Sequence, residues 1–214
     1  MLYRKFFDNK IYHVFNKSIA RFNIFKLNEN AYRFLEILDY YNDSAWKISL
    51  SKEKQLKHEF KLDDLLFLNE RPIVKFISYC VMPDHYHIVV KVLDQTKICH
   101  YLNNIGNAYT HFLNTKLNRK GPLWQSPYKM VLIKTNEQLL HVTRYVHLNP
   151  TTAQLVQKPE NWEFSSYRDF ITDQKYLDIV NEISIKRPHS YRTFVEDNQD
   201  YQTRIKLIKK VRID

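Results

Sequence analysis

The fold is decided by the stretch of the chain that reads Val81-Met82-Pro83-Asp84-His85-Tyr86-His87-Ile88-Val89-Val90. Pro83-Asp84 is a turn signal between two runs rich in β-branched and aromatic residues, so the stretch predicts a hairpin of two strands, over 73–81 and 85–93. Side chains two residues apart on a strand share a face. His85 and His87 therefore project side by side, whereas Tyr86 and its i+2 neighbours point the other way, into a core.

Two imidazoles on one face of a rigid strand make half of a metal site, because neutral imidazole is a common ligand of divalent ions. The pattern alone leaves another interpretation open, in which His85 and His87 only pack or form hydrogen bonds. A metal site needs at least one further ligand, which another part of the chain has to supply.

Outward from the hairpin, apolar periodicity predicts the remaining elements. The expected strands cover 10–18 and 128–134, and the expected helices cover 27–41, 96–119 and a segment from residue 135 onward. Asn28 is the expected N-cap of the first helix, and Thr135 with Gln138 offers a capping box for the last. The order strand, helix, two strands, helix, strand, helix predicts an α+β fold, a ferredoxin-like split βαβ antiparallel sheet with helices packed on it.

Composition indicates one domain and a polyanionic partner. Lys and Arg number 33 against 23 Asp and Glu, a formal charge of +10, which favours nucleic acid. The two glycines exclude a glycine-rich phosphate loop, so we expect no nucleotide cofactor. The two cysteines suggest no disulfide framework, and no apolar run is long enough to span a bilayer, so we expect no membrane association.

The expected domain covers 1–170, with a Lys-rich insertion at 42–70 that is either helical or a mobile loop. Residues 171–214 form a basic C-terminal extension.

The predicted last helix carries a second group of polar residues. His141, Tyr145 and Asn149 follow one another at i, i+4 and i+8, on one helix face. Tyr145 could be an ordinary amphipathic residue among 15 tyrosines. Alternatively, the amide oxygen of Asn149 completes a metal site with the histidine pair, and a tyrosine one turn earlier brings its hydroxyl beside the metal. That is the layout for attack of a tyrosyl oxygen on a phosphodiester.

These residues resemble those of a known family. The stretch 81–90 is similar to the histidine-hydrophobe-histidine (HUH) segment of the single-tyrosine transposases of the IS200-like superfamily. Arg144-Tyr145-Val146-His147-Leu148-Asn149-Pro150 resembles the nucleophile segment of the REP-associated tyrosine transposases within it. Residues 12–17, 121–125 and 162–167 are similar to further segments of the family, so the resemblance covers roughly residues 10 to 170.

The resemblance implies metal-dependent nicking and strand transfer of single-stranded or hairpin DNA, with a 5′-phosphotyrosine intermediate on Tyr145. It implies Mg²⁺ or Mn²⁺ held by His85, His87 and Asn149, and a monomer or homodimer in the bacterial cytoplasm, associated with the nucleoid. The candidate DNA-binding residues are Lys91, Arg119, Lys120, Lys129 and Lys134 for phosphates, and Trp124 for stacking on a base.

Some features depart from the family pattern or leave alternatives open. Ser126-Pro127 stands where the family often has Gly-Arg, which removes one DNA-contacting arginine. Residues before proline avoid the α conformation, so Pro150 predicts a helix that ends at Asn149 and leaves His147 as a competing ligand. Two other classes of function remain: a metal-dependent hydrolase without a tyrosyl intermediate, and a non-catalytic or domesticated DNA-binding protein derived from a transposase.

Overall fold

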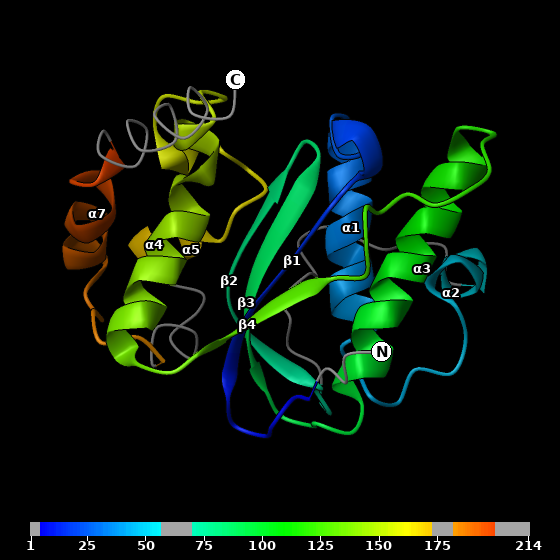
Figure 1. Cartoon of the computed structure of the whole chain (residues 1–214), viewed down its shortest axis with the longest axis horizontal. Helices are drawn as coiled ribbons and strands as arrows, with labels where there is room; N and C mark the ends of the chain where they lie inside the picture. The colour runs from blue at the N-terminus through cyan, green and yellow to red at the C-terminus, as the bar shows by residue number, and fades with distance from the viewer. Residues whose placement is uncertain (1–4, 57–69, 173–181, 200–214) are drawn as a thin grey trace.

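A four-stranded antiparallel sheet in the order β2-β3-β1-β4 lies at the centre of the molecule (Figure 1). The computed structural model describes residues 5–56, 70–172 and 182–199. The strands are β1 (Ile11–Lys17), β2 (Val74–Met82), β3 (His85–Val92) and β4 (Lys129–Ile133). This strand order is that of a ferredoxin-like split βαβ sheet, so the predicted fold class is confirmed.

Helices cover both faces of the sheet. They are α1 (Asn28–Tyr40), α2 (Leu50–Leu56), α3 (Ile98–Lys116), α4 (Asn136–Thr152), α5 (Tyr167–Ile171) and α7 (Pro188–Glu196), with 3₁₀ turns η1 (Ile19–Arg21) and η3 (Pro159–Asn161). The first three helices lie on one side of the sheet and α4, α5 and α7 on the other (Figure 1). Within the described residues, no helix is both long enough and apolar enough to cross a bilayer.

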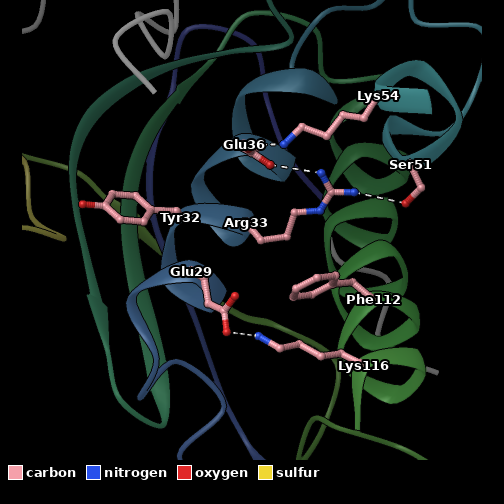
Figure 2. Close-up of a pocket in the computed structure, with 8 residues that line it drawn as sticks. All are labelled: Glu29, Tyr32, Arg33, Glu36, Ser51, Lys54, Phe112 and Lys116. Carbon is pink, nitrogen blue, oxygen red and sulfur yellow. Dashed lines mark hydrogen bonds and ion pairs between the residues drawn. The ribbon is translucent and has the colours of Figure 1, made fainter. Parts of the chain in front are cut away.

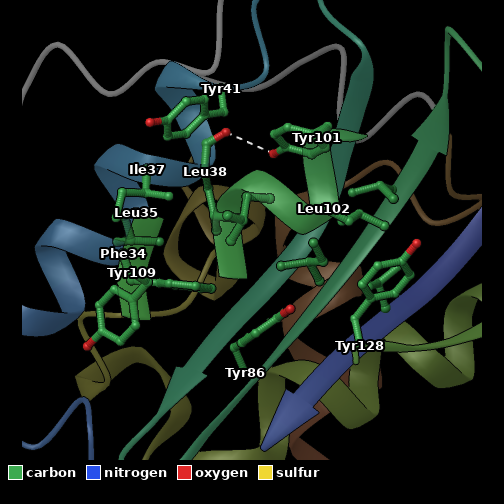
Figure 3. Close-up of a cluster of buried hydrophobic side chains, with 14 of the residues drawn as sticks. Phe34, Leu35, Ile37, Leu38, Tyr41, Tyr86, Tyr101, Leu102, Tyr109 and Tyr128 are labelled. Atoms are coloured by element: carbon green, nitrogen blue, oxygen red, sulfur yellow. Dashed lines mark hydrogen bonds between the residues drawn. The ribbon is translucent and has the colours of Figure 1, made fainter. Parts of the chain in front are cut away.

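The sheet face toward α1 and α3 is closed by a large aromatic and aliphatic core (Figure 3). Tyr86, on β3, packs its ring 4.7 Å from that of Phe34 on α1, measured between centroids. Tyr101 on α3 donates its hydroxyl to the carbonyl of Leu38, at 2.8 Å, so this buried hydroxyl is satisfied. The prediction that Tyr86 points into a core is therefore confirmed.

A second apolar cluster lies under α4, on the opposite face. Val89 of β3 and Leu139 and Val146 of α4 belong to it, and Tyr191 and Val195 of α7 join them. Within the basic extension predicted from residue 171, residues 188–196 form a helix whose apolar side is buried against α4 and α5. Residues 206–212, at the end of the predicted basic extension, lie outside the described residues.

Two predicted helix boundaries are wrong. Helix α1 has Leu27 rather than Asn28 as its N-cap, because the Leu27 carbonyl accepts the first bonds of the helix, from the amides of residues 30 and 31. Helix α4 continues through Pro150 to Thr152. Proline is tolerated there because it lies in the last turn, where its missing N–H removes a single helix bond. The predicted cap of α4 is confirmed, since the Thr135 hydroxyl accepts from the Gln138 amide at 3.1 Å.

The two ends of the predicted insertion meet at Asn42. This buried side chain accepts from the amides of Ile73 and Val74 at 3.1 and 2.9 Å and donates to the Val74 carbonyl at 3.0 Å. A β-bridge joins Asp43 to Pro72 next to it. Helix α2 lies within this segment. The helical interpretation of the rest of the insertion depends on Leu62, Leu65 and Leu66, which lie outside the described residues.

Candidate active site

His85 and His87 lie on β3, which is paired on both sides, with β2 and β1. Their ring centroids are 5.1 Å apart and the ring planes are nearly perpendicular. The alternation of strand side chains thus brings the two imidazoles next to each other on the face that α4 covers, opposite to the large core. Hydrogen bonds and packing on both sides of β3 keep this pair in place.

The ring of His85 is held by Asp84, the residue before it in the turn. The Asp84 Oδ1 is 2.5 Å from Nδ1 of His85, and Lys17 Nζ lies 3.3 Å from the other carboxylate oxygen. Burial acts to raise the pKa of Asp84, but His85 and Lys17 outweigh it and lower this pKa to about 2. An ionised carboxylate on Nδ1 fixes the orientation of an imidazole, so Nε2 is the nitrogen through which His85 would bind a metal.

A third histidine, His13 on β1, lies beside this pair and was not among the predicted site residues. Its Nε2 lies 2.9 Å from Nδ1 of His87, and the two rings are stacked with centroids 5.0 Å apart. Burial lowers the pKa of His13 to about 4. The alternation of β1 already places His13 on one face with Phe15, but its approach to His87 depends on β1 pairing with β3, which the local sequence does not specify.

Helix α4 brings Tyr145 to this group. The Tyr145 ring lies 5.4 Å from that of His87 and 6.3 Å from that of His13, edge-on to both, and the residue is 42% exposed. Burial raises the pKa of the Tyr145 hydroxyl, and a hydrogen bond with the Asn149 side chain acts in the opposite direction. The predicted neighbours on α4 and β3 are thus brought together within one chain.

Asn149 is buried one turn after Tyr145. Its Nδ2 donates to the Tyr145 carbonyl at 2.9 Å, so the amide oxygen is the atom that a cation would use. Clusters of three or more His, Cys, Asp or Glu with the spacing of a metal site are absent from the ranges that the structure describes. A metal at the histidine pair would therefore depend on Asn149 for its third protein ligand, and imidazole nitrogens with an amide oxygen suit a divalent cation.

His147 points away from the histidine pair. It is fully buried, with Nδ1 2.8 Å from the Tyr191 hydroxyl and Nε2 2.8 Å from the Ser166 hydroxyl. Burial lowers the pKa of His147 to about 3. With both ring nitrogens engaged in the core under α4, the geometry favours Asn149 over His147 as the third ligand. His141 lies at the exposed start of α4, 2.8 Å from the guanidinium of Arg144.

The candidate DNA-binding residues fall into different surroundings. Lys129 is exposed and pairs in register with Phe15, so it lies on the face of the sheet that carries the histidines. Lys91 also lies on that face, but its Nζ is 3.1 Å from Glu182. Lys120 and Lys134 are exposed, and Arg119 donates to the carbonyl of Pro122.

Trp124 packs mainly against the large core. Its Nε1 donates to the Gly106 carbonyl at 3.2 Å, and its ring lies 5.6 Å from Tyr86 and 6.0 Å from Tyr109, between centroids. The residue is half-buried, so part of the indole is already used in packing. Stacking of a base on Trp124 stays a prediction that this packing disfavours.

A pocket lies on the other side of the sheet, between α1, α2 and α3 (Figure 2). Its basic residues are paired within the pocket: Lys116 with Glu29, and both Lys54 and Arg33 with Glu36. This pairing neutralises most of the positive charge that a phosphate would need. The pocket is therefore no part of the candidate active site.

Part of the chain matches the model of a known protein family. Residues 65–149 match the family of IS200-like transposases, and this range contains His85, His87, Tyr145 and Asn149. This part of the chain is thus similar to the IS200-like transposases, and the resemblance predicted from the sequence is confirmed.

Two individual proteins that are similar to this chain are REP-associated tyrosine transposases. A candidate REP-associated tyrosine transposase of Haemophilus influenzae is 21% identical over 112 residues, which are 47% of this chain and 62% of that protein. The match thus spans less than two thirds of that relative. A solved structure of a REP-associated tyrosine transposase bound to a REP hairpin has the same fold, with a TM-score of 0.54 and 15% identity over 80% of this chain and 85% of the other.

A crystal structure of a candidate transposase from Deinococcus radiodurans is also similar, at 14% identity over 68% of this chain and 95% of the other. Its TM-score of 0.37 is too low to support an argument about this chain.

Proposed function

We propose that this chain nicks single-stranded or hairpin DNA and transfers the strand, with Tyr145 as the nucleophile. The proposal includes Mg²⁺ or Mn²⁺ held by His85, His87 and Asn149. The observation that supports it most strongly is the 5.4 Å separation of the Tyr145 and His87 rings, which come from α4 and β3 of the same chain. Because one chain supplies every residue of the proposed site, a monomer suffices, and a homodimer remains compatible with it.

The protein residues would hold the cation, orient its ligands and bind the DNA phosphates. When bound, a divalent cation supplies Lewis-acid stabilisation of the charge that develops on a phosphate oxygen. Asp84 holds Nδ1 of His85, so Nε2 is the nitrogen through which His85 would bind the cation. Lys129, which is exposed on the same sheet face, adds positive charge for the phosphates next to the scissile one.

The chemistry conserves one phosphodiester bond through each exchange. The Tyr145 hydroxyl loses its proton and its oxygen attacks the phosphorus, while the bond from phosphorus to the 3′ oxygen breaks and that oxygen takes up a proton. The products are a 5′-phosphotyrosine and a free 3′-hydroxyl. Attack by a second DNA 3′-hydroxyl restores Tyr145 and joins the strands, so the reaction consumes no nucleotide.

Hairpin DNA is the proposed substrate form, because the solved relative of the same fold is bound to a REP hairpin. The formal charge of +10 agrees with a polyanionic partner. With such a partner, we place the protein in the bacterial cytoplasm, in association with the nucleoid.

The test is covalent trapping. A hairpin oligonucleotide with a labelled single-stranded flank is incubated with the protein and Mn²⁺, and the products are separated under denaturing conditions. We expect a protein–DNA adduct that peptide mass spectrometry maps to Tyr145, with the label on the side of the nick that carries the 5′ phosphate. Cleavage without an adduct would indicate a hydrolase, and binding without cleavage would indicate a DNA-binding protein derived from a transposase. Either result would overturn the proposal.

A further inference from the structure

We propose that His13 is a positioning residue for the metal site: its Nε2 accepts a hydrogen bond from Nδ1–H of His87 and fixes the tautomer in which Nε2 of His87 carries the lone pair. The inference rests on the proposed function, because it concerns the same metal site. It adds a residue from a strand outside the matched range 65–149.

The strand register explains why the two histidines meet. His13 pairs with Val89 of β3, whereas His87 pairs with Phe15 of β1. His13 and His87 are therefore diagonal neighbours on one face of an antiparallel pair, a position from which long and aromatic side chains can reach each other. The 2.9 Å contact between Nε2 of His13 and Nδ1 of His87 joins these diagonal neighbours.

Packing holds His13 in the position that the hydrogen bond requires. The residue is only 9% exposed, and its ring lies 4.9 Å from that of Phe15 and 5.0 Å from that of His87. β1 is paired on both sides, with β3 and β4, so the backbone under His13 is fixed as well. A side chain in such a setting can determine the orientation of its partner.

The chemistry of imidazole selects one of two arrangements. A neutral imidazole has one N–H and one lone pair, so either ring can donate in this contact. If His13 donates, a neutral His87 carries its proton on Nε2 and presents no lone pair there. If His87 donates, its Nε2 is a metal ligand. Only the second arrangement agrees with the proposed metal site, and it makes His13 the acceptor.

The two histidine ligands of the proposed site then receive different kinds of support. Nδ1 of His85 is held by an ionised carboxylate, Asp84, whereas Nδ1 of His87 is held by an imidazole from another strand. Both groups act on the nitrogen that does not bind metal, and partners of this kind typically change metal affinity by about 10–100-fold when they are removed.

The test compares Mn²⁺ binding, followed by electron paramagnetic resonance of the free ion, in variants of the full chain. His13→Leu removes the acceptor, and we expect its affinity for Mn²⁺ to fall by about 10–100-fold. His13→Gln places an amide oxygen near the position of Nε2, so it should restore most of the affinity. His111→Leu, at an exposed position on α3, is the matched control and should bind as the wild type does. If His13→Leu does not fold, His13→Asn replaces it, because its shorter amide does not reach His87.

A second measurement reads the tautomer directly. Long-range ¹H–¹⁵N correlation spectra of the metal-free protein should show the proton of His87 on Nδ1 in the wild type and a shift toward Nε2 in His13→Leu. A wild-type spectrum with the proton on Nε2, or unchanged Mn²⁺ affinity in His13→Leu, would overturn the inference. If His85→Ala weakens Mn²⁺ binding and His13→Leu does not, only the role of His13 fails. If the wild type binds no Mn²⁺, the metal site itself fails as well.

Discussion

The two faces of the central sheet are built from the same strands and have different contents. On the face toward α1 and α3, Val14, Ile88 and Val90 are completely buried among other apolar groups. One residue along each strand, on the opposite face, His13 and His87 are buried in contact with each other. Alternation along a strand thus gives polar groups the rigid support of a packed core.

The two faces also differ in how completely they are covered. The large core closes one face, whereas α4 leaves part of the other open, where Val131 is 54% exposed and Tyr145 42% exposed. Substitutions on the closed face should therefore change stability, and substitutions on the open face should change the reaction. The following predictions test this separation, ordered by their expected effect on DNA cleavage.

Tyr145→Phe should have the largest effect. It removes the attacking oxygen, so single-turnover cleavage should fall by several orders of magnitude, as it does when a nucleophile is lost. Hairpin binding and the thermal unfolding midpoint should stay close to those of the wild type. The matched control is Tyr86→Phe, which removes a hydroxyl from the closed face. Near-normal cleavage by Tyr145→Phe would reduce Tyr145 to a packing residue.

His85→Ala, His87→Ala or removal of metal with EDTA should come next. Loss of a cation that stabilises developing charge is worth several kcal/mol, so cleavage should fall by about 100-fold or more. DNA affinity should be largely kept and should decrease steeply with salt, since it comes mostly from Lys and Arg. Filter binding and cleavage assays on the same samples measure both. Cleavage that is insensitive to EDTA would contradict a metal role.

Asn149→Ala and His147→Ala should have different effects, because the two side chains lie on different sides of α4. We expect Asn149→Ala to slow cleavage and weaken Mn²⁺ binding by about 10–100-fold. His147→Ala removes the hydrogen-bond partner of the buried Tyr191 hydroxyl, at a cost of about 1–3 kcal/mol in the free energy of unfolding, whereas the Ser166 hydroxyl keeps its bonds to Tyr79. The effect on cleavage should be smaller than that of Asn149→Ala. Calorimetry and cleavage rates together test this. The reverse pattern would make His147 the ligand.

The cleavage rate should rise with pH. Burial raises the pKa of Tyr145 above its ordinary value near 10, and the deprotonated form is the nucleophile. Below that pKa the phenolate fraction increases about tenfold per pH unit, so single-turnover rates should increase from pH 6.5 to 9, less steeply where a bound cation assists deprotonation. A rate that falls over this range would indicate another group as the nucleophile.

Ile88→Val should have the smallest effect on cleavage. Ile88 is the neighbour of His87 in the sequence but faces the closed core, with no exposed surface. Removing one methylene group there should lower the free energy of unfolding by about 0.5–1.5 kcal/mol. The cleavage rate and Mn²⁺ affinity should not change. A loss of activity without a loss of stability would show that the two faces are coupled.

Local periodicity was sufficient to predict much of the fold and part of the candidate site. Alternation around His85 and His87 predicts their common face, and the spacing of Tyr145 and Asn149 predicts their approach on one helix. Both patterns depend only on geometry within a single element, which a sequence specifies directly.

Contacts between distant segments could not be predicted in this way. His13 meets His87 through a strand pairing, Lys91 meets Glu182 from beyond the predicted domain, and Trp124 packs on the core through a bond to Gly106. Helix α7 was missed because its nine residues are largely polar and its few apolar groups acquire a partner only once α4 is in place.

The amide of Asn42 has a consequence for how this chain tolerates changes in length. Because it fastens the start of the 43–72 segment to the beginning of β2, the sheet receives the same anchoring whatever lies between the two ends. Doubling the length of a loop whose ends are held in this way costs only about 0.6 kcal/mol in closure entropy. A longer segment should therefore leave the register of β2 unchanged, whereas a deletion that removes α2 would also take Leu50 out of the large core.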